Sequence, residues 1–230
     1  MLNPTIPVNI AVKICGLTLP EQAVAIAEMG VRALGFIAVR SSPRYVPPEV
    51  IADICHLLPP AVLTVAVVAN PDLEELQHLV ITTGVQGVQL HGSESPEFCQ
   101  RVRDTFPDRV LIKALRVRSP ATLAEIPAYA PLVDRILLDA YHPQQLGGTG
   151  QPFDWTLLKG LQIPCPWWLA GGITPENCRQ AIAQTQPQGI DLSSGVESRP
   201  GVKDLGRVAA LLSNLGINAN HSPHPEGTRF

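Results

Sequence analysis

Two turns of small residues near the C-terminal end of the chain have the composition of a phosphate-binding site. Gly171-Gly172 follows the apolar run Trp168-Leu169-Ala170. Ser193-Ser194-Gly195 follows Ile190-Asp191-Leu192 in the same way. A strand that ends in such a turn before a helix begins exposes backbone N–H groups, which attract anions. One Gly-Gly turn alone is an ordinary packing feature, but two on adjacent parallel strands predict a phosphate cradle.

A cysteine and an aspartate stand where acid–base chemistry needs them, each at the end of an apolar run. Cys15 precedes Gly16 and an expected helix start, a setting that can lower the pKa of a thiol and supply a thiolate base. Asp139 ends the run Ile136–Leu138, and a partly desolvated carboxyl there suits a general acid. The alternatives are an inert buried cysteine, and an aspartate that caps a helix or pairs with a neighbouring strand end.

Three basic side chains follow other apolar runs. Arg44 lies in Ser42-Pro43-Arg44-Tyr45-Val46 and His91 follows Val88-Gln89-Leu90, so both are candidates to bind an anionic or aromatic substrate. Each could equally be a residue of a surface loop. Lys113 stands one position inside an expected strand end, where we expect it to point into the interior and pair with a neighbour.

The elements that must position these residues form a repeating strand–helix series. The expected strands are short, almost continuously apolar runs, typical of strands buried on both faces. They cover residues 10–15, 33–39, 62–68, 87–90, 110–114, 135–139, 167–170 and 190–193. Helix starts recur between them, predicted from a capping residue followed by proline or an acid. They are Thr18-Leu19-Pro20-Glu21 (a capping box), Asn70-Pro71-Asp72, Ser95-Pro96-Glu97 and Thr174-Pro175-Glu176, and Met29-Gly30 marks a helix end.

Eight such units predict an α/β fold, a single (β/α)8 TIM barrel over residues 9–215. A doubly wound sheet uses the same units, but no GxGxxG follows the first strand, which favours closure into a barrel. Residues 1–8 are expected to be a short leader, and the polar, aperiodic residues 216–230 a disordered tail.

Composition excludes several classes of function. The 230 residues carry a net charge near −3, with 45% hydrophobic and 16% charged residues, so no general field attracts nucleic acid or an anionic membrane. The five cysteines include no CxxC and no nearby histidine at ligand spacing, which argues against structural zinc or a disulfide framework and for a reducing compartment. We expect a cytoplasmic protein without a signal peptide or membrane span, a monomer or homodimer, acting on a small phosphorylated molecule.

Taken together, the motifs resemble those of phosphoribosylanthranilate isomerase, a cofactor-free barrel enzyme of tryptophan biosynthesis. The matching segments follow one another over about 190 residues, and the set is far more specific than any one of them. They are Lys13–Thr18, Gly35-Phe36, Ser42–Val46, Val88–Gly92, Lys113-Ala114, Leu138-Asp139, Gly147–Gly150, Phe153–Trp155, Leu169–Gly172, Pro175–Asn177 and Asp191–Glu197.

The resemblance implies an Amadori rearrangement of an aminoaldose phosphate to an aminoketose, without metal or organic cofactor. It implies Cys15 as general base, Asp139 as general acid and Arg44 as a contact to the anthranilate part, with His91 a further candidate for substrate binding. It also implies that Gly171, Gly172, Ser193, Ser194 and Gly195 bind the phosphate.

Two residues depart from the family pattern. Gln151 replaces a basic residue often found after the GGTG-like turn, and Ala170 replaces a small hydroxyl residue before Gly-Gly. Other functions use similar turns: a flavin-binding barrel, a non-catalytic phosphosugar-binding barrel, and the related indole-forming synthase, which needs a lysine near an early strand end. Lys13 lies two positions short of that end, which counts against the synthase. Activity on the related histidine-pathway aminoaldose stays open.

Overall fold

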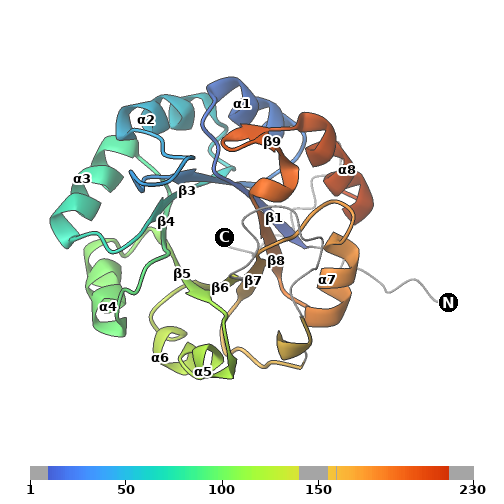
Figure 1. Ribbon diagram of the computed structural model, residues 1–230. Coiled ribbons are helices and arrows are strands. Elements are labelled where there is room, and N and C mark those ends of the chain that lie inside the picture. The colour runs from blue at the N-terminus through green and yellow to red at the C-terminus, as the bar shows by residue number, and fades with distance from the viewer. Residues whose placement is uncertain (1–9, 140–154, 159, 218–230) are drawn as a thin grey trace.

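Eight parallel strands close into a barrel in chain order, and the helices surround it (Figure 1). The computed structural model describes residues 10–139, 155–158 and 160–217. The strands are β1 (Ala11–Cys15), β2 (Ala33–Ile37), β3 (Leu63–Val68), β4 (Gly87–Leu90), β5 (Val110–Arg116), β6 (Arg135–Asp139), β7 (Trp167–Ala170) and β8 (Gly189–Leu192). The prediction of a TIM barrel is confirmed, and every expected strand overlaps an observed one, with ends that differ by at most two residues.

Closure depends on β1, which pairs with β2 on one side and with β8 on the other. Ala11 lies opposite Gly189 and Ile14 opposite Leu192 in this last pairing. Closure leaves the barrel without a free edge strand.

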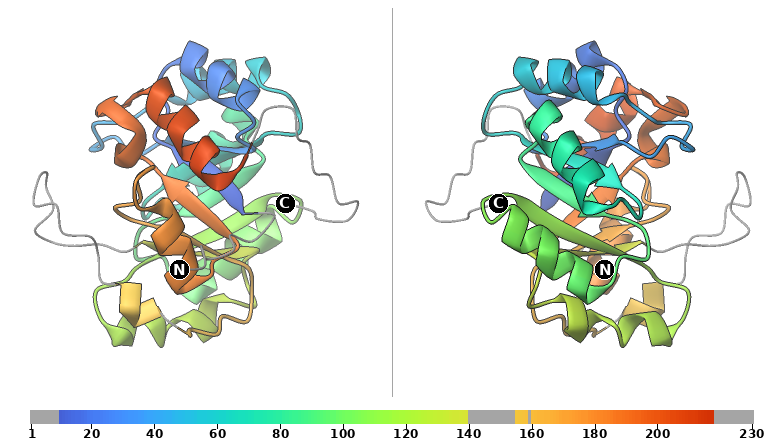
Figure 2. Two further views of the ribbon diagram at one scale, coloured as in Figure 1. Left: turned by 90° about the vertical axis from the view of Figure 1, so that its right-hand side faces the viewer. Right: turned by 90° about the vertical axis from the view of Figure 1, so that its left-hand side faces the viewer.

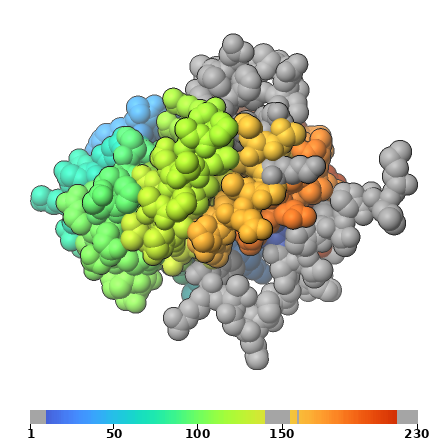
Figure 3. Space-filling model, turned by 90° about the horizontal axis from the view of Figure 1, so that it is seen from below, coloured from blue at the N-terminus to red at the C-terminus, as the bar shows by residue number. Residues whose placement is uncertain are grey.

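The helices lie outside the strands, as the side views show, with red α8 and orange α7 on one side and α3 and α4 on the other (Figure 2). They are α1 (Pro20–Glu28), α2 (Pro48–Leu57), α3 (Leu73–Thr83), α4 (Pro96–Thr105), α5 (Pro120–Leu123), α6 (Ile126–Tyr129), α7 (Cys178–Thr185) and α8 (Leu205–Leu215). Two 3₁₀ turns, η1 (Trp155–Leu158) and η2 (Ser194–Val196), and a hairpin of β9 (Glu197–Arg199) and β10 (Val202–Lys203) complete the described elements. Seen from below, the outer face runs from α4 through α5 and α6 to η1, which contacts α7 (Figure 3).

Two of the predicted helix boundaries are confirmed. Ser95 caps α4, since its side chain accepts a hydrogen bond from the Phe98 N–H and Pro96 takes the first helical position. Gly30 follows the end of α1 with φ of +102°, a conformation that favours glycine.

Three other caps were predicted at the wrong residue. Thr18 does not cap α1, because its hydroxyl donates instead to the Gly201 carbonyl, 2.6 Å away. Asp72, rather than Asn70, caps α3 in a capping box with Glu75. The segment after Thr174 forms a turn, and α7 begins only at Cys178. In each case the local sequence permits the cap and a longer-range or competing hydrogen bond replaces it.

Side chains alternate between the barrel interior and the helix layer along each strand. The interior is filled by a small cluster made of Ala33, Leu63, Val65, Ile112, Ala114, Leu137, Trp168 and Ala170. A larger apolar cluster lies between the strands and the helices. Because Ile112 and Ala114 face inward, Lys113 faces the helices, so the prediction that it points into the barrel is wrong.

The C-terminal boundary differs slightly from the expected one. Gly216, with φ of +72°, ends α8, and Ile217 packs against the core, so the helix cap extends two residues past the predicted end of the barrel. The expected leader, the rest of the expected tail, the Gly147–Gly150 turn and Gln151 lie outside the described residues. No helix in the part of the chain that the structure describes is long and apolar enough to cross a membrane.

Replacement of Gly189 by alanine is expected to destabilise the barrel. An added Cβ would lie 2.5 Å from two atoms of the Trp168 indole, which fills the interior. Overpacking of this kind lowers the free energy of unfolding by about 1–3 kcal/mol, measured by urea denaturation. Gly206→Ala in α8 is the control, because its Cβ would meet only Asp204 Oδ1 at 3.1 Å and alanine favours helix. An unchanged urea midpoint in Gly189→Ala would contradict this account of the interior.

Candidate active site

A cavity of about 240 Å³ opens at the C-terminal ends of the strands, where all the predicted site residues meet. Its lining includes Cys15, Arg44, His91, Asp139, Gly171, Gly172, Ser193, Ser194 and Gly195. Cys15 comes from the first strand and Asp139 from the sixth, and both face one space. The period-two alternation explains this: Cys15, Asp139 and Ala170 are inward-facing last residues of β1, β6 and β7, whereas β4 and β8 end with the outward-facing Leu90 and Leu192.

The Gly171-Gly172 turn and the Ser193–Gly195 turn lie against each other in the lining of this cavity. Gly171 and Gly172 have φ of +89° and +65°, and their N–H groups donate to no residue that the structure describes. A Cβ on Gly195 would lie 1.9 Å from the Ile173 carbonyl oxygen, so only glycine allows this approach. Asn177 holds the first turn, accepting from the Thr174 N–H and donating to the Gly172 carbonyl. The arrangement presents backbone donors to an anion.

Cys15 lies beside a buried ion pair that crosses the β1–β8 junction. Lys13 Nζ is 3.0 Å from each carboxylate oxygen of Asp191. A Cβ on Gly35 would lie 2.8 Å from Cys15 Sγ and 2.9 Å from Lys13 Nζ, so the absence of a side chain there leaves room for both.

Burial raises the pKa of the Cys15 thiol, although the nearby Lys13 ammonium acts in the opposite direction. The sequence offered a setting that can lower this pKa, with an inert buried cysteine as the alternative, and in the structure burial acts in the raising direction. The physical reason is desolvation: the cysteine is 7% exposed, so the thiolate loses more solvation than the neighbouring cations return.

Asp139 is reached through a chain of polar contacts from β4. Gln89 Nε2 lies 2.9 Å from His91 Nδ1, and His91 Nε2 lies 3.3 Å from Asp139 Oδ2. Because the Gln89 amide N–H₂ can only donate, His91 Nδ1 is the acceptor in the first contact, which leaves Nε2 to donate to Asp139. Asp139 therefore has a polar partner from a neighbouring strand end, His91, which was the alternative to a catalytic role. Its carboxyl nevertheless lines the cavity.

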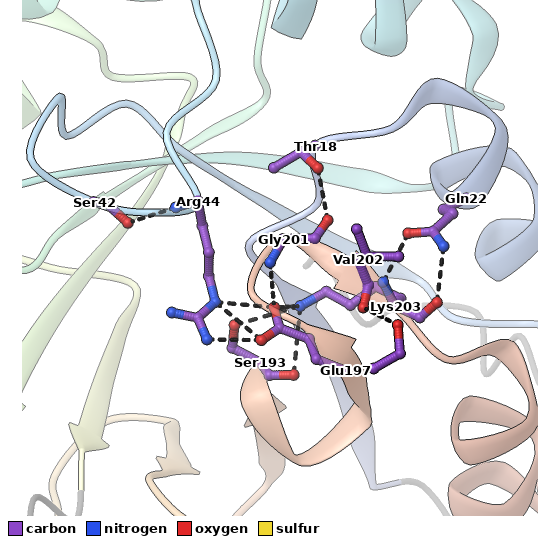
Figure 4. Close-up of polar contacts among 10 residues, drawn as sticks. Thr18, Gln22, Ser42, Arg44, Ser193, Glu197, Gly201, Val202 and Lys203 are labelled. Atoms are coloured by element: carbon purple, nitrogen blue, oxygen red, sulfur yellow. Dashed lines mark hydrogen bonds and ion pairs between the residues drawn. The ribbon is translucent and has the colours of Figure 1, made fainter. Parts of the chain in front are cut away.

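Arg44 reaches the cavity from the loop after β2 and is held by Glu197 of β9 (Figure 4). Its Nε and Nη2 both contact the Glu197 carboxylate, the latter at 2.7 Å. Lys203 of β10 contacts the same carboxylate at 2.7 Å.

Lys113 lies outside this cavity. Its Nζ donates to Glu94 Oε2 at 2.6 Å and to the Gly92 carbonyl at 2.8 Å, so it has a partner, but in the loop after β4 and not inside the barrel, where the pairing was predicted. Tyr129 of α6 packs against the ammonium and donates to the Glu94 carbonyl. The lysine thereby holds the loop that follows His91.

The whole barrel matches one known family. The model of N-(5'-phosphoribosyl)anthranilate (PRA) isomerase matches residues 12–214. The N-(5'-phosphoribosyl)anthranilate isomerase of Thermosynechococcus vestitus is 84% identical over 230 residues, which is 100% of each chain. The chain belongs to the PRA isomerase family. Its function is the isomerisation of N-(5'-phosphoribosyl)anthranilate in tryptophan biosynthesis.

Solved PRA isomerases share the fold. The enzyme from Thermotoga maritima superposes with a TM-score of 0.81 at 34% identity, covering 90% of this chain and 98% of that one. A second PRA isomerase structure holds reduced 1-(o-carboxyphenylamino)-1-deoxyribulose 5-phosphate (rCdRP), with a TM-score of 0.77, 33% identity and the same coverages. A third describes monomers of the dimeric T. maritima enzyme, with a TM-score of 0.77, 32% identity and again 90% and 98% coverage.

Sequence reasoning missed several residues of this PRA isomerase site. Lys13 was weighed only as the lysine of the related synthase, Asp191 was quoted only as part of a motif, and Gln89, Glu197 and Lys203 received no role. The sequence gives little indication of these residues. A charged residue inside an apolar run suggests a buried ion pair, but the sequence does not show which residue is its partner. Among the residues described, no group of three or more histidine, cysteine or acidic side chains is arranged to hold a metal ion.

Alkylation of Cys15 is expected to report its raised pKa. Burial keeps the thiol protonated, so the rate of reaction with iodoacetamide should still be rising at the ordinary thiol pKa of 9.0. Peptide mass spectrometry after timed alkylation measures that rate. Lys13→Met should move the profile to higher pH, because it removes the cation that favours the thiolate. A plateau already reached at about pH 7 would contradict the assignment.

Proposed function

We propose that Cys15 and Asp139 are the base and acid of the isomerisation. What supports the proposal is their position: the thiol and the carboxyl line one cavity, next to two turns with the geometry of an anion cradle. The substrate phosphate would bind at Gly171, Gly172, Ser193, Ser194 and Gly195. Held at that end, the sugar would lie between the two reacting side chains.

In the first step, the protonated Asp139 carboxyl gives its proton to the ring oxygen of the furanose. The C1–O bond breaks, and the lone pair of the anthranilate nitrogen forms an iminium ion at C1. His91 lies beside Asp139 and would orient its carboxyl towards the ring oxygen.

In the second step, the Cys15 thiolate removes the proton from C2. The electron pair of that bond flows into the iminium and gives an enolamine, which takes a proton at C1 and releases one from the C2 hydroxyl to become the ketone. Protons given and taken balance, as an isomerisation requires. Lys13 provides the positive charge beside the thiolate and offsets part of its desolvation.

Arg44 would bind the carboxylate of the anthranilate, with His91 contacting the substrate near the ring. Both line the cavity, and Arg44 enters it from the loop after β2, which β1 separates from the Ser193 turn of β8. Phosphate at one end and carboxylate at the other would fix C2 relative to Cys15, so remote binding energy serves the chemistry.

The functional unit is proposed to be residues 9–215, acting in the cytoplasm as a monomer or a homodimer. The dimeric relative from T. maritima supports the second form. Light scattering of the purified protein decides between them.

Cys15→Ala and Asp139→Asn are each expected to lower kcat by about 10²- to 10⁴-fold, the usual contribution of a positioned proton transfer. The loss of anthranilate-type fluorescence as the aminoaldose is consumed measures turnover. Cys55→Ala and Asp104→Asn are matched controls, since both lie on outer helices away from the cavity, and they should retain full activity. Turnover of folded Cys15→Ala close to that of the unmodified enzyme would remove the thiol from the mechanism.

A further inference from the structure

One carboxylate, Glu197, joins the loop after β2 to the β9–β10 hairpin at the edge of the cavity (Figure 4). Arg44 Nε lies 2.9 Å from Glu197 Oε1 and Arg44 Nη2 lies 2.7 Å from Oε2. Lys203 Nζ contacts Oε1 at 2.7 Å, and the Gly201 N–H donates to the same oxygen at 3.2 Å. Both carboxylate oxygens are therefore occupied by donors from the protein itself.

These charges are shielded from water. The Glu197 side chain is 4% exposed and that of Lys203 is 0% exposed, while Arg44 is 21% exposed. Burial opposes ionisation of Glu197, but Arg44 and Lys203 outweigh it and hold the pKa of the carboxyl below its usual value. With two cations and one anion, the cluster keeps one net positive charge beside a cavity that takes an anionic substrate.

The contacts fix how Arg44 meets the cavity. Two of its nitrogens are used by Glu197, while Nη1 makes no hydrogen bond to any residue that the structure describes. Figure 4 shows one edge of the guanidinium turned to the carboxylate, with the remaining nitrogen on the far side. Since Arg44 lines the cavity, this nitrogen is the donor left for a ligand.

The backbone at Gly16 leaves room for the Arg44 side chain beside Ser193. Gly16 has φ of +74°, and a Cβ there would lie 2.7 Å from Arg44 Cδ and 2.9 Å from Ser193 Oγ. Lys203 Nζ also lies 3.4 Å from the carbonyl and hydroxyl oxygens of Ser193. The lysine that neutralises Glu197 is thus itself fixed against the last turn of the barrel.

We propose that Glu197 is a positioning residue for recognition of the substrate carboxylate: it holds the Arg44 guanidinium by one edge so that the other edge binds the aromatic acid. Lys203 keeps Glu197 charged and in place. This inference rests on the proposed role of Arg44. Nothing in it requires Glu197 to touch the substrate.

A pair of ligands separates this role from general structural support. One is rCdRP, and the other is its analogue without the carboxylate, reduced 1-phenylamino-1-deoxyribulose 5-phosphate. Binding of each is measured by calorimetry, and the ratio of the two dissociation constants isolates recognition of the carboxylate. Glu197→Gln removes the charge and turns an amide N–H₂ towards a donor, so Arg44 loses its bidentate partner.

In Glu197→Gln, binding of rCdRP should weaken about 10- to 100-fold, whereas binding of the analogue should change less than about 3-fold. KM should rise while kcat falls much less, since Cys15 and Asp139 are untouched. Glu197→Asp keeps the charge but moves the carboxylate away from Arg44 by the length of one methylene group. We therefore expect a smaller weakening of rCdRP binding than in Glu197→Gln. Glu75→Gln, the same change in the exposed capping box of α3, should alter neither ligand.

Arg44→Met distinguishes failure of this inference from failure of the proposed function. If Arg44→Met loses the preference for rCdRP and both Glu197 variants keep it, the positioning role is wrong while the Arg44 contact stands. If Arg44→Met also keeps the preference, the carboxylate is bound elsewhere and both fall. Equal weakening of the two ligands in folded Glu197→Gln and Glu197→Asp would also overturn the inference, because it would indicate general disruption.

Discussion

Pairing of the first strand with the last is the constraint on which this site depends. β1 and β8 align Lys13 with Asp191, two residues 178 positions apart in the chain, and their ion pair forms at this junction. The same register brings Cys15 towards Ser193 and thus the thiol towards one of the two turns proposed to bind phosphate. A one-residue slip would turn each of these side chains to the opposite face. The chemistry of the mouth is therefore a consequence of how the sheet closes.

Each buried lysine around this mouth contacts a carboxylate. Lys13 contacts Asp191, Lys113 contacts Glu94 and Lys203 contacts Glu197, and each lysine is at most 2% exposed. Removing one partner of such a pair leaves an uncompensated charge and typically costs about 3–5 kcal/mol. Lys13–Asp191 joins two strands, whereas the other two pairs join a strand to a loop or a neighbouring strand at the same end of the barrel.

The fold was predictable because burial on both faces leaves a direct trace in the sequence. Runs such as Leu63–Val68 and Ile136–Leu138 are nearly continuous in apolar residues, and the residues that end such runs include the site candidates Cys15 and Asp139. Helix starts were less predictable. Thr18 lies in a sequence typical of a helix cap, but its hydroxyl donates a hydrogen bond to the carbonyl of Gly201, 183 residues away. The raised pKa of Cys15 could not be read from its neighbours in the chain, since it follows from packing in the closed barrel.

The hairpin of β9 and β10 has a consequence for the order in which the molecule is built. The Gly201 carbonyl accepts a hydrogen bond from the Thr18 hydroxyl, Lys203 exchanges hydrogen bonds with Gln22, and Glu197 contacts Arg44. Loops near the N-terminus therefore form these contacts only with residues near the end of the chain. During synthesis on the ribosome these early loops have no partner until almost all the other strands have emerged. Contacts of such long sequence separation form late and slowly. A chain that ends before this hairpin therefore lacks the partners of Thr18, Gln22 and Arg44, so the contacts at the mouth depend on residues that are synthesised last.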